Sequence, residues 1–198
     1  MYQFENGAFD NRVWLANNVV SMAKPYNYAF IDGANLHFTY ENLPWKLDYQ
    51  KLFNHLGRRL DVKVAYYFVG NIPGNERLYE TLEGYGYTLK LKEPSPYTTE
   101  EQYCPHCNQL IAPETKRNKG DCDSFITQKV LEDLDIYSKA VLITSDGDFD
   151  NLVNALLQRD KLKTVFAPCK NGCSWLLRSA AHGRIAFIDD LRNELEKT

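Results

Sequence analysis

The sequence predicts an α/β protein, a three-layer sandwich in which a mainly parallel central sheet carries helices on both faces. Short segments rich in β-branched and aromatic residues alternate with segments of helical periodicity, and this alternation favours parallel strands joined by helical crossovers. The chain has 198 residues, which suits one domain. Hydrophobic residues make up 44% of it and aromatic residues 13%, enough to form a core without disulfides.

Six apolar segments bounded by turn residues predict the strands of this sheet. Residues 28–31 end at Asp32-Gly33, and residues 140–144 end at Ser145-Asp146-Gly147. The segments are short and rich in valine, isoleucine and aromatic residues, which is typical of strands. In chain order they are residues 28–31, 62–69, 87–91, 140–144, 164–167 and 185–188.

Between and after these segments, apolar residues recur at helical spacing. Within residues 47–60, for example, Leu52, Leu56 and Leu60 repeat at every fourth position and share one face. The tryptophans Trp14, Trp45 and Trp175 are expected to be packing residues. The predicted helices cover residues 47–60, 76–85, 123–137, 149–158, 175–181 and 190–196.

Two segments lie outside the alternation. Residues 1–27 are interpreted as an N-terminal extension of a domain that covers residues 28–198, with a helix expected over 11–22. The extension is expected to pack either on the domain or on a second copy of the chain, which would make a homo-oligomer. Residues 93–120 form a polar insertion that contains two of the cysteines and is interpreted as a long irregular segment, functional or mobile.

Charge and hydropathy exclude several classes of protein. The formal net charge is −3, which argues against a broad basic surface that tracks nucleic acid, but not against an enzyme that meets phosphate through bound cations. No apolar run approaches the roughly 20 residues of a membrane helix, so no membrane partner is expected. The N-terminal residues lack the pattern of a secretory signal, and a cytoplasmic location is expected.

Acidic residues follow two of the predicted strands. Asp32 comes directly after residues 28–31, and Asp146, Asp148 and Asp150 follow residues 140–144 at every second position. Because ligands of open parallel sheets sit beyond the carboxyl ends of the strands, these residues should share one edge. Their carboxylates suit Mg²⁺ or Mn²⁺. The alternative is that Asp146 or Asp148 caps the next helix, with Asp150 as an acid in its first turn.

A third acidic cluster, Asp121-Cys122-Asp123, stands at the start of a predicted helix. One of its aspartates could be a helix cap, but a cap does not explain both. Asp32-Gly33-Ala34-Asn35 also has the composition of a turn and a helix cap. Three acidic clusters at one sheet edge would repel one another without a cation, so we interpret them as a metal site.

Three blocks of the sequence resemble those of a known family. They are Phe30-Ile31-Asp32-Gly33-Ala34-Asn35-Leu36, then Lys119-Gly120 with Asp123, then Thr144-Ser145-Asp146-Gly147-Asp148-Phe149. Their order, spacing and strand–turn–helix contexts resemble the NYN domain, a member of the PIN-like nuclease superfamily, over about residues 28–190. The resemblance implies a PIN-like, Rossmann-like fold.

The resemblance also implies a catalytic site and a reaction. Asp32, Asp123, Asp146 and Asp148 would hold one or two Mg²⁺ or Mn²⁺ ions, and Asn35 would orient Asp32 or contact the substrate phosphate. The family's reaction is hydrolysis of an RNA phosphodiester, in which the metal activates water and stabilises charge on the phosphate. We therefore expect a metal-dependent endoribonuclease, a hydrolase with RNA as substrate.

Supporting residues follow from the same blocks. Ser145 and Thr144 would support the site by hydrogen bonds, with Ser145 also expected to contact substrate. Asp121 departs from the family pattern, and could be an auxiliary ligand or only a helix cap. Three cations precede Asp123 and could neutralise substrate phosphates, or could belong to a solvated loop. They are Lys116, Arg117 and Lys119.

Other functions account for these residues less well. A NYN-like module could bind RNA or a protein partner with little or no catalysis, although the retention of all four carboxylates favours an enzyme. A phosphatase with an aspartyl nucleophile needs a second aspartate where Ala34 stands. A dinucleotide-binding oxidoreductase is disfavoured because no GxGxxG segment follows a strand.

The five cysteines of the chain do not suggest a disulfide framework. Two close pairs could together supply four thiolates to a structural Zn²⁺ ion that ties the insertion to the loop before Trp175, with His106 as a reserve ligand. The pairs are Cys104 with Cys107 and Cys169 with Cys173. The alternatives are free buried thiols or a half-site shared across a dimer.

The remaining cysteine features have simpler interpretations. A thioredoxin-like redox role for Cys104-Pro105-His106-Cys107 is disfavoured because Pro113 and polar flanks follow it rather than a long helix. Cys122 is expected to be a thiol in the core or at a helix start.

Overall fold

The computed structural model describes residues 26–41, 44–113, 115–119 and 122–198. At residues 41, 95–98 and 115–119 the structure describes only the backbone. The helix expected over 11–22 and the packing of the N-terminal extension lie outside the described residues. In the described part of the chain, no helix is long and apolar enough to cross a membrane.

Six strands form one parallel sheet in the order β10-β9-β8-β1-β2-β3, and every pairing within it is parallel. All six were predicted from the sequence. The central strand β1 pairs with β2 on one side and β8 on the other, with Ile31 opposite both Tyr67 and Ile143. The bounds are β1 Asn27–Asp32, β2 Val62–Gly70, β3 Thr88–Lys92, β8 Ala140–Ile143, β9 Leu162–Ala167 and β10 Ile185–Phe187.

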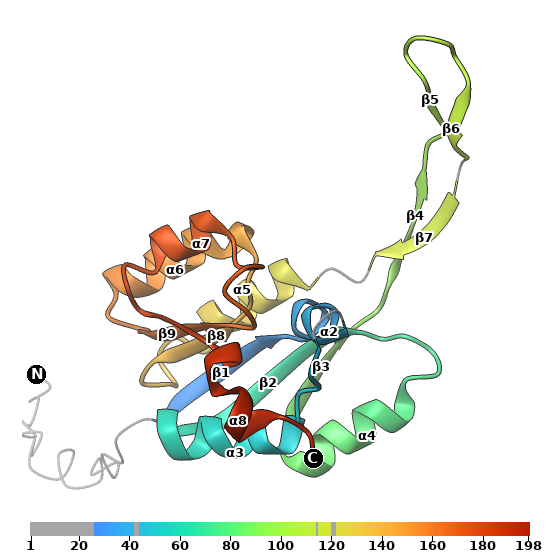
Figure 1. Ribbon diagram of the computed structural model, residues 1–198. Coiled ribbons are helices and arrows are strands. Elements are labelled where there is room, and N and C mark those ends of the chain that lie inside the picture. The colour runs from blue at the N-terminus through green and yellow to red at the C-terminus, as the bar shows by residue number, and fades with distance from the viewer. Residues whose placement is uncertain (1–25, 42–43, 114, 120–121) are drawn as a thin grey trace, which may run out of the picture.

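Helices cover both faces of the sheet, as Figure 1 shows. The helices α5 (Asp123–Glu132), α6 (Asp150–Gln158) and α7 (Trp175–Ala180) lie on one face, and α3 (Tyr49–Leu60), α4 (Glu76–Tyr85) and α8 (Arg192–Leu195) lie on the other. Successive side chains of β1 alternate between the two buried clusters, Phe30 in the first and Ile31 in the second. The predicted three-layer α/β sandwich is therefore confirmed.

Several helix bounds differ from the sequence prediction, and the differences are largest for α5 and for the C-terminal helix. The helix α5 ends at Glu132 rather than at 137, and the chain then turns so that the buried Tyr137 hydroxyl donates to the Val130 carbonyl at 3.0 Å. Residues 190–196 are divided between the 3₁₀ helix η2 (Ile188–Leu191) and the short α8.

One helix was not predicted. The helix α2 (Gly33–Glu41) follows β1 directly, at the edge of the sheet where the acidic residues gather. Its first turn is closed by Asp32, whose Oδ1 accepts from the backbone N–H of Asn35 at 3.0 Å. Among the helix's described side chains, Leu36 and Tyr40 are the apolar ones buried in the core, so its sequence carries little helical periodicity.

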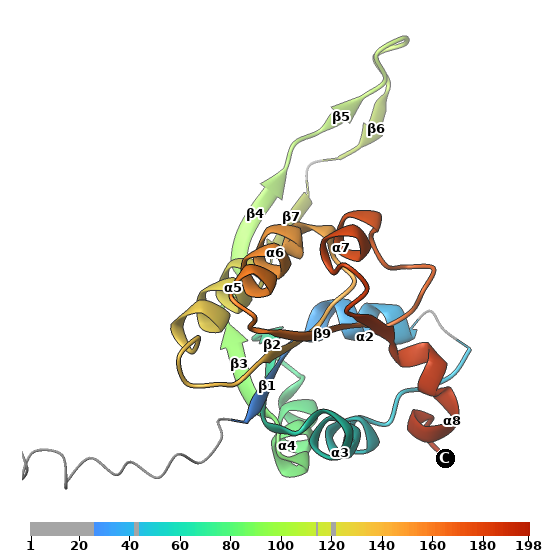
Figure 2. The ribbon, with the colours of Figure 1, turned by 90° about the vertical axis from the view of Figure 1, so that its left-hand side faces the viewer.

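The sequence suggested that the polar insertion is irregular, but the structure shows regular strands there. Its strands pair in an antiparallel two-stranded ribbon, β4 (Ser95–Thr99) with β7 (Thr115–Lys119) and β5 (Gln102–Tyr103) with β6 (Leu110–Ala112). The two sides satisfy each other's backbone hydrogen bonds, and Pro96 is tolerated because a two-stranded ribbon has free edges. Figures 1 and 2 show the ribbon projecting far from the sheet and its helices.

Candidate functional site

Three carboxylates meet at the carboxyl end of the sheet. Asp123, Asp146 and Asp148 each offer one oxygen, and these oxygens all lie within 4.8 Å of one another. Asp123 is the first residue of α5, whereas Asp146 and Asp148 belong to the turn between β8 and α6. Asp148 is exposed and the other two are half-buried, so the group is open to solvent on one side. The sequence predicted all three members of this group.

Asp146 makes two hydrogen bonds that shape the turn after β8. Asp146 stands before the 3₁₀ helix η1 (Gly147–Phe149), and its Oδ1 accepts from the backbone N–H of Asp148 at 3.0 Å. Its own N–H donates to Thr144 Oγ1 at 3.2 Å. Asp146 is thus both a cap, as the alternative interpretation held, and a member of the acidic group. Asp150 is the first residue of α6, in agreement with a first-turn acid.

Asp32 lies beside this group and is tied to it through a hydroxyl. The carboxylate is buried, with 6% of its surface exposed. Thr144 Oγ1 donates to Asp32 Oδ2 at 3.2 Å and accepts from the Asp146 N–H. Asp32 is not one of the three carboxylates within 4.8 Å of one another, so among the described residues the four predicted ligands form a group of three with a fourth behind it.

Asn35 joins α2 to the turn after β8. Its Oδ1 accepts two hydrogen bonds from Ser145, one from the backbone N–H at 3.0 Å and one from the hydroxyl at 2.8 Å. Asn35 contacts Asp32 through its backbone N–H rather than its side chain. Ser145 is itself buried, which fits the supporting role expected of it.

Two glycines allow the site's elements to approach closely. A Cβ on Gly33 would lie 2.3 Å from Tyr67 Cε1 and 2.6 Å from the Phe68 carbonyl oxygen. A Cβ on Gly147 would lie 2.5 Å from Ser174 Oγ. Packing requires glycine at position 33, where the neighbours are a buried ring and the backbone, whereas a Cβ at position 147 would first displace the side chain of Ser174.

The close approach at Gly147 reveals a residue that the sequence did not indicate. Ser174 precedes α7, and its backbone N–H donates to the Ser145 carbonyl at 2.9 Å. Ser174 and Asn35 therefore both bond to Ser145, directly before Asp146. Nothing in the residues around Ser174 pointed to this role, because it depends on a contact between distant segments.

Trp175 is not a packing residue, contrary to the sequence expectation. The short helix α7 buries Leu177 and Ala180, three positions apart, and turns Trp175 outward with 74% of its surface exposed. Trp175 directly follows Ser174, the residue that contacts the acidic turn. Trp45, by contrast, is buried as expected, and its Nε1–H donates to Asp189 Oδ1 at 2.9 Å.

The expected phosphate-contacting cations and Asp121 cannot be placed in the same way. Lys116, Arg117 and Lys119 lie on β7, which leads toward α5, but their side chains lie outside the described part of the chain, as does Asp121. Their roles remain predictions.

The two cysteine pairs are not brought together. Cys104 and Cys107 lie in the turn between β5 and β6, at the far end of the ribbon, whereas Cys169 and Cys173 are buried in the body after β9 (Figure 1). Among the described residues no group of three or more metal ligands contains a cysteine. Burial raises the pKa of the Cys173 thiol, which favours the neutral form there. Cys122 is buried in the core, as expected.

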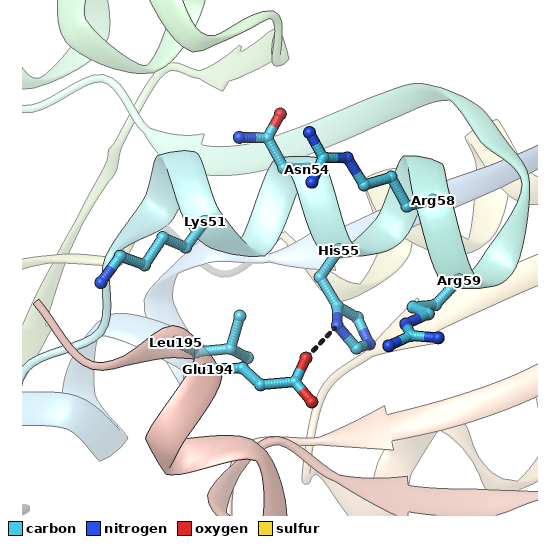
Figure 3. Close-up of a pocket in the computed structure, with 7 residues that line it drawn as sticks. All are labelled: Lys51, Asn54, His55, Arg58, Arg59, Glu194 and Leu195. Carbon is cyan, nitrogen blue, oxygen red and sulfur yellow. Dashed lines mark ion pairs between the residues drawn. The ribbon is translucent and has the colours of Figure 1, made fainter.

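Two cavities formed by described residues lie away from the acidic group. One of about 440 Å³ opens between α3 and α8 (Figure 3), where His55 Nδ1 lies 3.4 Å from Glu194 Oε2 and Arg58 and Arg59 line the rim. No aspartate of the acidic group lines it. A smaller opening of about 370 Å³ lies between the end of β3 and the start of α5, and Lys92, Glu93 and Ser124 are among its lining residues.

Comparison with known proteins agrees with this geometry. A family model described as "NYN domain" matches residues 28–189. The "Low amplitude and bright protein LabA" of Synechococcus elongatus is 25% identical over 173 residues, 85% of this chain and 87% of that protein. A solved structure of a protein of unknown function from Vibrio parahaemolyticus, 23% identical, covers 87% of this chain and 97% of its own with a TM-score of 0.63, and shows the fold alone.

The family match runs through all the acidic segments described above. It begins at the start of β1, includes the starts of α2 and α5 and the turn after β8, and ends beyond β10. The residues that gather at the sheet edge are therefore within the matched part, and the chain belongs to the NYN domain family of the PIN-like nuclease superfamily.

Proposed function

We propose that this protein is a metal-dependent endoribonuclease that hydrolyses RNA phosphodiester bonds at the group formed by Asp123, Asp146 and Asp148. The observation that carries the proposal is the approach of three carboxylate oxygens, from two separate elements, to within 4.8 Å of one another. Like charges at that distance disfavour ionisation unless a cation lies between them. The proposal therefore needs a divalent cation.

The chemistry of the donor set indicates which cation would bind. All three side chains offer carboxylate oxygen, the ligand type that Mg²⁺ and Mn²⁺ prefer over soft sulfur or nitrogen donors. When bound, such an ion activates water and stabilises negative charge on a phosphoryl group. Asp32 would add negative charge from behind and, through Thr144, hold Asp146 in position.

The residues around the group are suited to positioning rather than to proton transfer. Asn35 and Ser174 hold the turn after β8 from two sides, which limits movement of Asp146 and Asp148. Asp148 is the exposed member, so a phosphate would approach from its side. Fixing ligands to a fraction of an ångström is what catalysis by a bound metal requires.

Three features beside the group support RNA as the substrate. The exposed Trp175 offers a surface on which an unpaired base can stack. The opening between the end of β3 and the start of α5 is lined by Lys92 as well as by Glu93. The strand β7 contributes Lys116, Arg117 and Lys119 to the segment before Asp123. With a net charge of −3, binding would depend on such local contacts and on metal.

All five cysteines are free thiols, which supports a cytoplasmic location.

The test is cleavage of labelled single-stranded RNAs, some linear and some closed into circles, with Mg²⁺ or Mn²⁺ present or chelated. Wild type should cut both forms, because an endonuclease needs no free end, and Asp146→Asn should lose the activity. The matched control is Asp135→Asn, the same change at an exposed aspartate outside the acidic group. Equal activity in wild type and Asp146→Asn, or no activity in either, would refute the proposal. RNA binding without cleavage would favour the binding-module alternative.

A further inference from the structure

The turn at the tip of the ribbon has the backbone geometry of a preformed metal-binding loop. The N–H of Cys104 donates to the Gln109 carbonyl at 2.8 Å, and the N–H of Asn108 donates to the Cys104 carbonyl at 2.9 Å. Asn108 adopts a left-handed conformation with φ of 54°, which closes the turn directly after Cys107. The loop is therefore shaped by its backbone before any ligand binds.

The two sulfurs of this turn belong to cysteines separated by two residues on the same tight loop, at the tip of the ribbon. Thiolate is the form of cysteine that binds metal, and metal binding itself displaces the thiol protons. Cys107 is exposed and Cys104 half-buried, so both are accessible. Two thiolates held by one tight turn are half of a structural zinc site.

Within one chain, the described residues do not complete that site. A structural zinc ion takes four ligands. The other histidines and cysteines of the chain outside the turn are His37, His55, His182, Cys122, Cys169 and Cys173, and all of them lie on the body of the domain. His106 would add at most a third ligand. Among the described residues, Cys104 and Cys107 belong to no group of three or more metal ligands.

A second copy of the same turn can supply what is missing. The ribbon carries its tip away from the sheet and helices in both views, so a second tip could approach without contact between the domains (Figures 1 and 2). A tetrahedral site with two ligands from each of two identical chains is compatible with a twofold axis through the metal. Large apolar side chains are also exposed on this hairpin at Tyr103, Leu110 and Ile111, the last with 65% of its surface, and a second tip would cover them.

We propose that the turn Cys104–Cys107 is half of a zinc site that is completed by the same turn of a second copy, so that one Zn²⁺ held by four thiolates joins two chains at their ribbon tips. The four thiols release their protons to solvent on binding, and no oxidation is involved. The proposal is independent of RNA cleavage, because it concerns residues remote from the acidic group.

The test uses the full chain under a phosphine reductant, with zinc content and molar mass measured by elemental analysis and light scattering. Zinc should bind at one ion per two chains, with a doubled molar mass, and a chelator should reverse both. Cys107→Ser should lose zinc and remain a monomer. Because Cys107 is exposed, this variant should fold as wild type, which circular dichroism checks. His106→Ala, at an exposed position in the same turn, should keep both properties.

Other results would overturn the proposal. One zinc per chain on a monomer would indicate a site within one chain. Absence of zinc binding, a doubled mass that survives Cys107→Ser or the chelator, or loss of zinc in His106→Ala would each overturn the four-thiolate bridge. Cobalt in place of zinc gives an independent readout, since its absorption spectrum distinguishes four sulfur ligands from a mixed set.

Discussion

The side chain of Asn35 accepts two hydrogen bonds from Ser145, at 3.0 Å from the backbone N–H and at 2.8 Å from the hydroxyl. The two residues are 110 positions apart, and the contact joins the start of α2 to the turn that carries Asp146. The contact makes the position of the acidic turn depend on Asn35. It also joins the segments that follow β1 and β8 at the carboxyl ends of these strands.

Replacement of Asn35 by alanine should therefore weaken both fold and site. The change leaves two donors of the buried Ser145 without their acceptor, which costs about 1–3 kcal/mol of unfolding free energy. Urea denaturation measures this cost, and RNA cleavage should fall beyond what the folded fraction explains. Asn193→Ala, an exposed asparagine on α8, is the control and should change stability by less than about 0.5 kcal/mol. An Asn35→Ala variant as stable and active as wild type would contradict the positioning role.

Two neighbouring aspartates allow a matched test of metal binding. Asp148 belongs to the acidic group and Asp150 does not, yet Asp148→Asn and Asp150→Asn remove the same charge two positions apart. Titration calorimetry with Mn²⁺ should show at least about a tenfold loss of affinity for Asp148→Asn, since even residues outside a ligand shell cost about 10–100-fold. Asp150→Asn should bind within about twofold of wild type.

A stability measurement separates metal binding from folding in that experiment. Without metal, Asp148→Asn should be no less stable than wild type, because it removes one of three mutually repelling carboxylates. Addition of Mn²⁺ should raise the melting temperature of wild type and of Asp150→Asn more than that of Asp148→Asn. Equal responses from all three proteins would place the metal elsewhere.

The strands and most helices could be predicted from the sequence because their buried residues form recognisable local patterns. All four residues of β8 are buried, and a short apolar run between turn residues is the mark of such a strand. The helix α2 left no comparable pattern, since it rests on Leu36 and Tyr40 alone. The ribbon was missed because β4 and β7 are stabilised by pairing with each other across the insertion, which no local pattern reveals.

The same distinction applies to the candidate site. Asp146 and Asp148 could be predicted because they follow a recognisable strand, and Asp32 because the sheet brings strand ends to one edge. The sequence predicted that Thr144 would support the site by hydrogen bonds, but it could not indicate that Thr144 links Asp32 to Asp146, or that Ser174 bonds to the turn. These relations depend on distances between segments, and so did the separation of the two cysteine pairs.

Gly147 offers a test of the contact between the acidic turn and α7. Gly147→Ala would place a Cβ 2.5 Å from Ser174 Oγ, and relief of that clash should cost about 1–3 kcal/mol of stability. Adding Ser174→Gly should recover part of the loss, because Ser174 makes no side-chain cap that would be sacrificed. Gly84→Ala in α4, with nothing within 4 Å of the added Cβ, should instead stabilise by about 0.4–1 kcal/mol. Chemical denaturation of the four variants measures the cycle, and additive effects of Gly147→Ala and Ser174→Gly would argue against a direct clash.

Trp175 should contribute to RNA binding and not to folding. With 74% of its surface exposed, its removal in Trp175→Ala should change unfolding free energy by less than about 0.5 kcal/mol. If an unpaired base stacks on the indole, the same variant should lose about 1–3 kcal/mol of binding free energy for single-stranded RNA. Fluorescence anisotropy with a short labelled RNA, in Ca²⁺ or with an Asp146→Asn background to prevent cleavage, measures that loss.

Two control variants test whether the aromatic face is what matters. Trp175→Phe should retain most of the affinity, since it keeps an aromatic face. Ile136→Ala, another exposed apolar residue, stands at the far end of the α5 segment and should leave RNA affinity unchanged. Equal affinities for Trp175→Ala and Ile136→Ala would remove Trp175 from the RNA-binding surface.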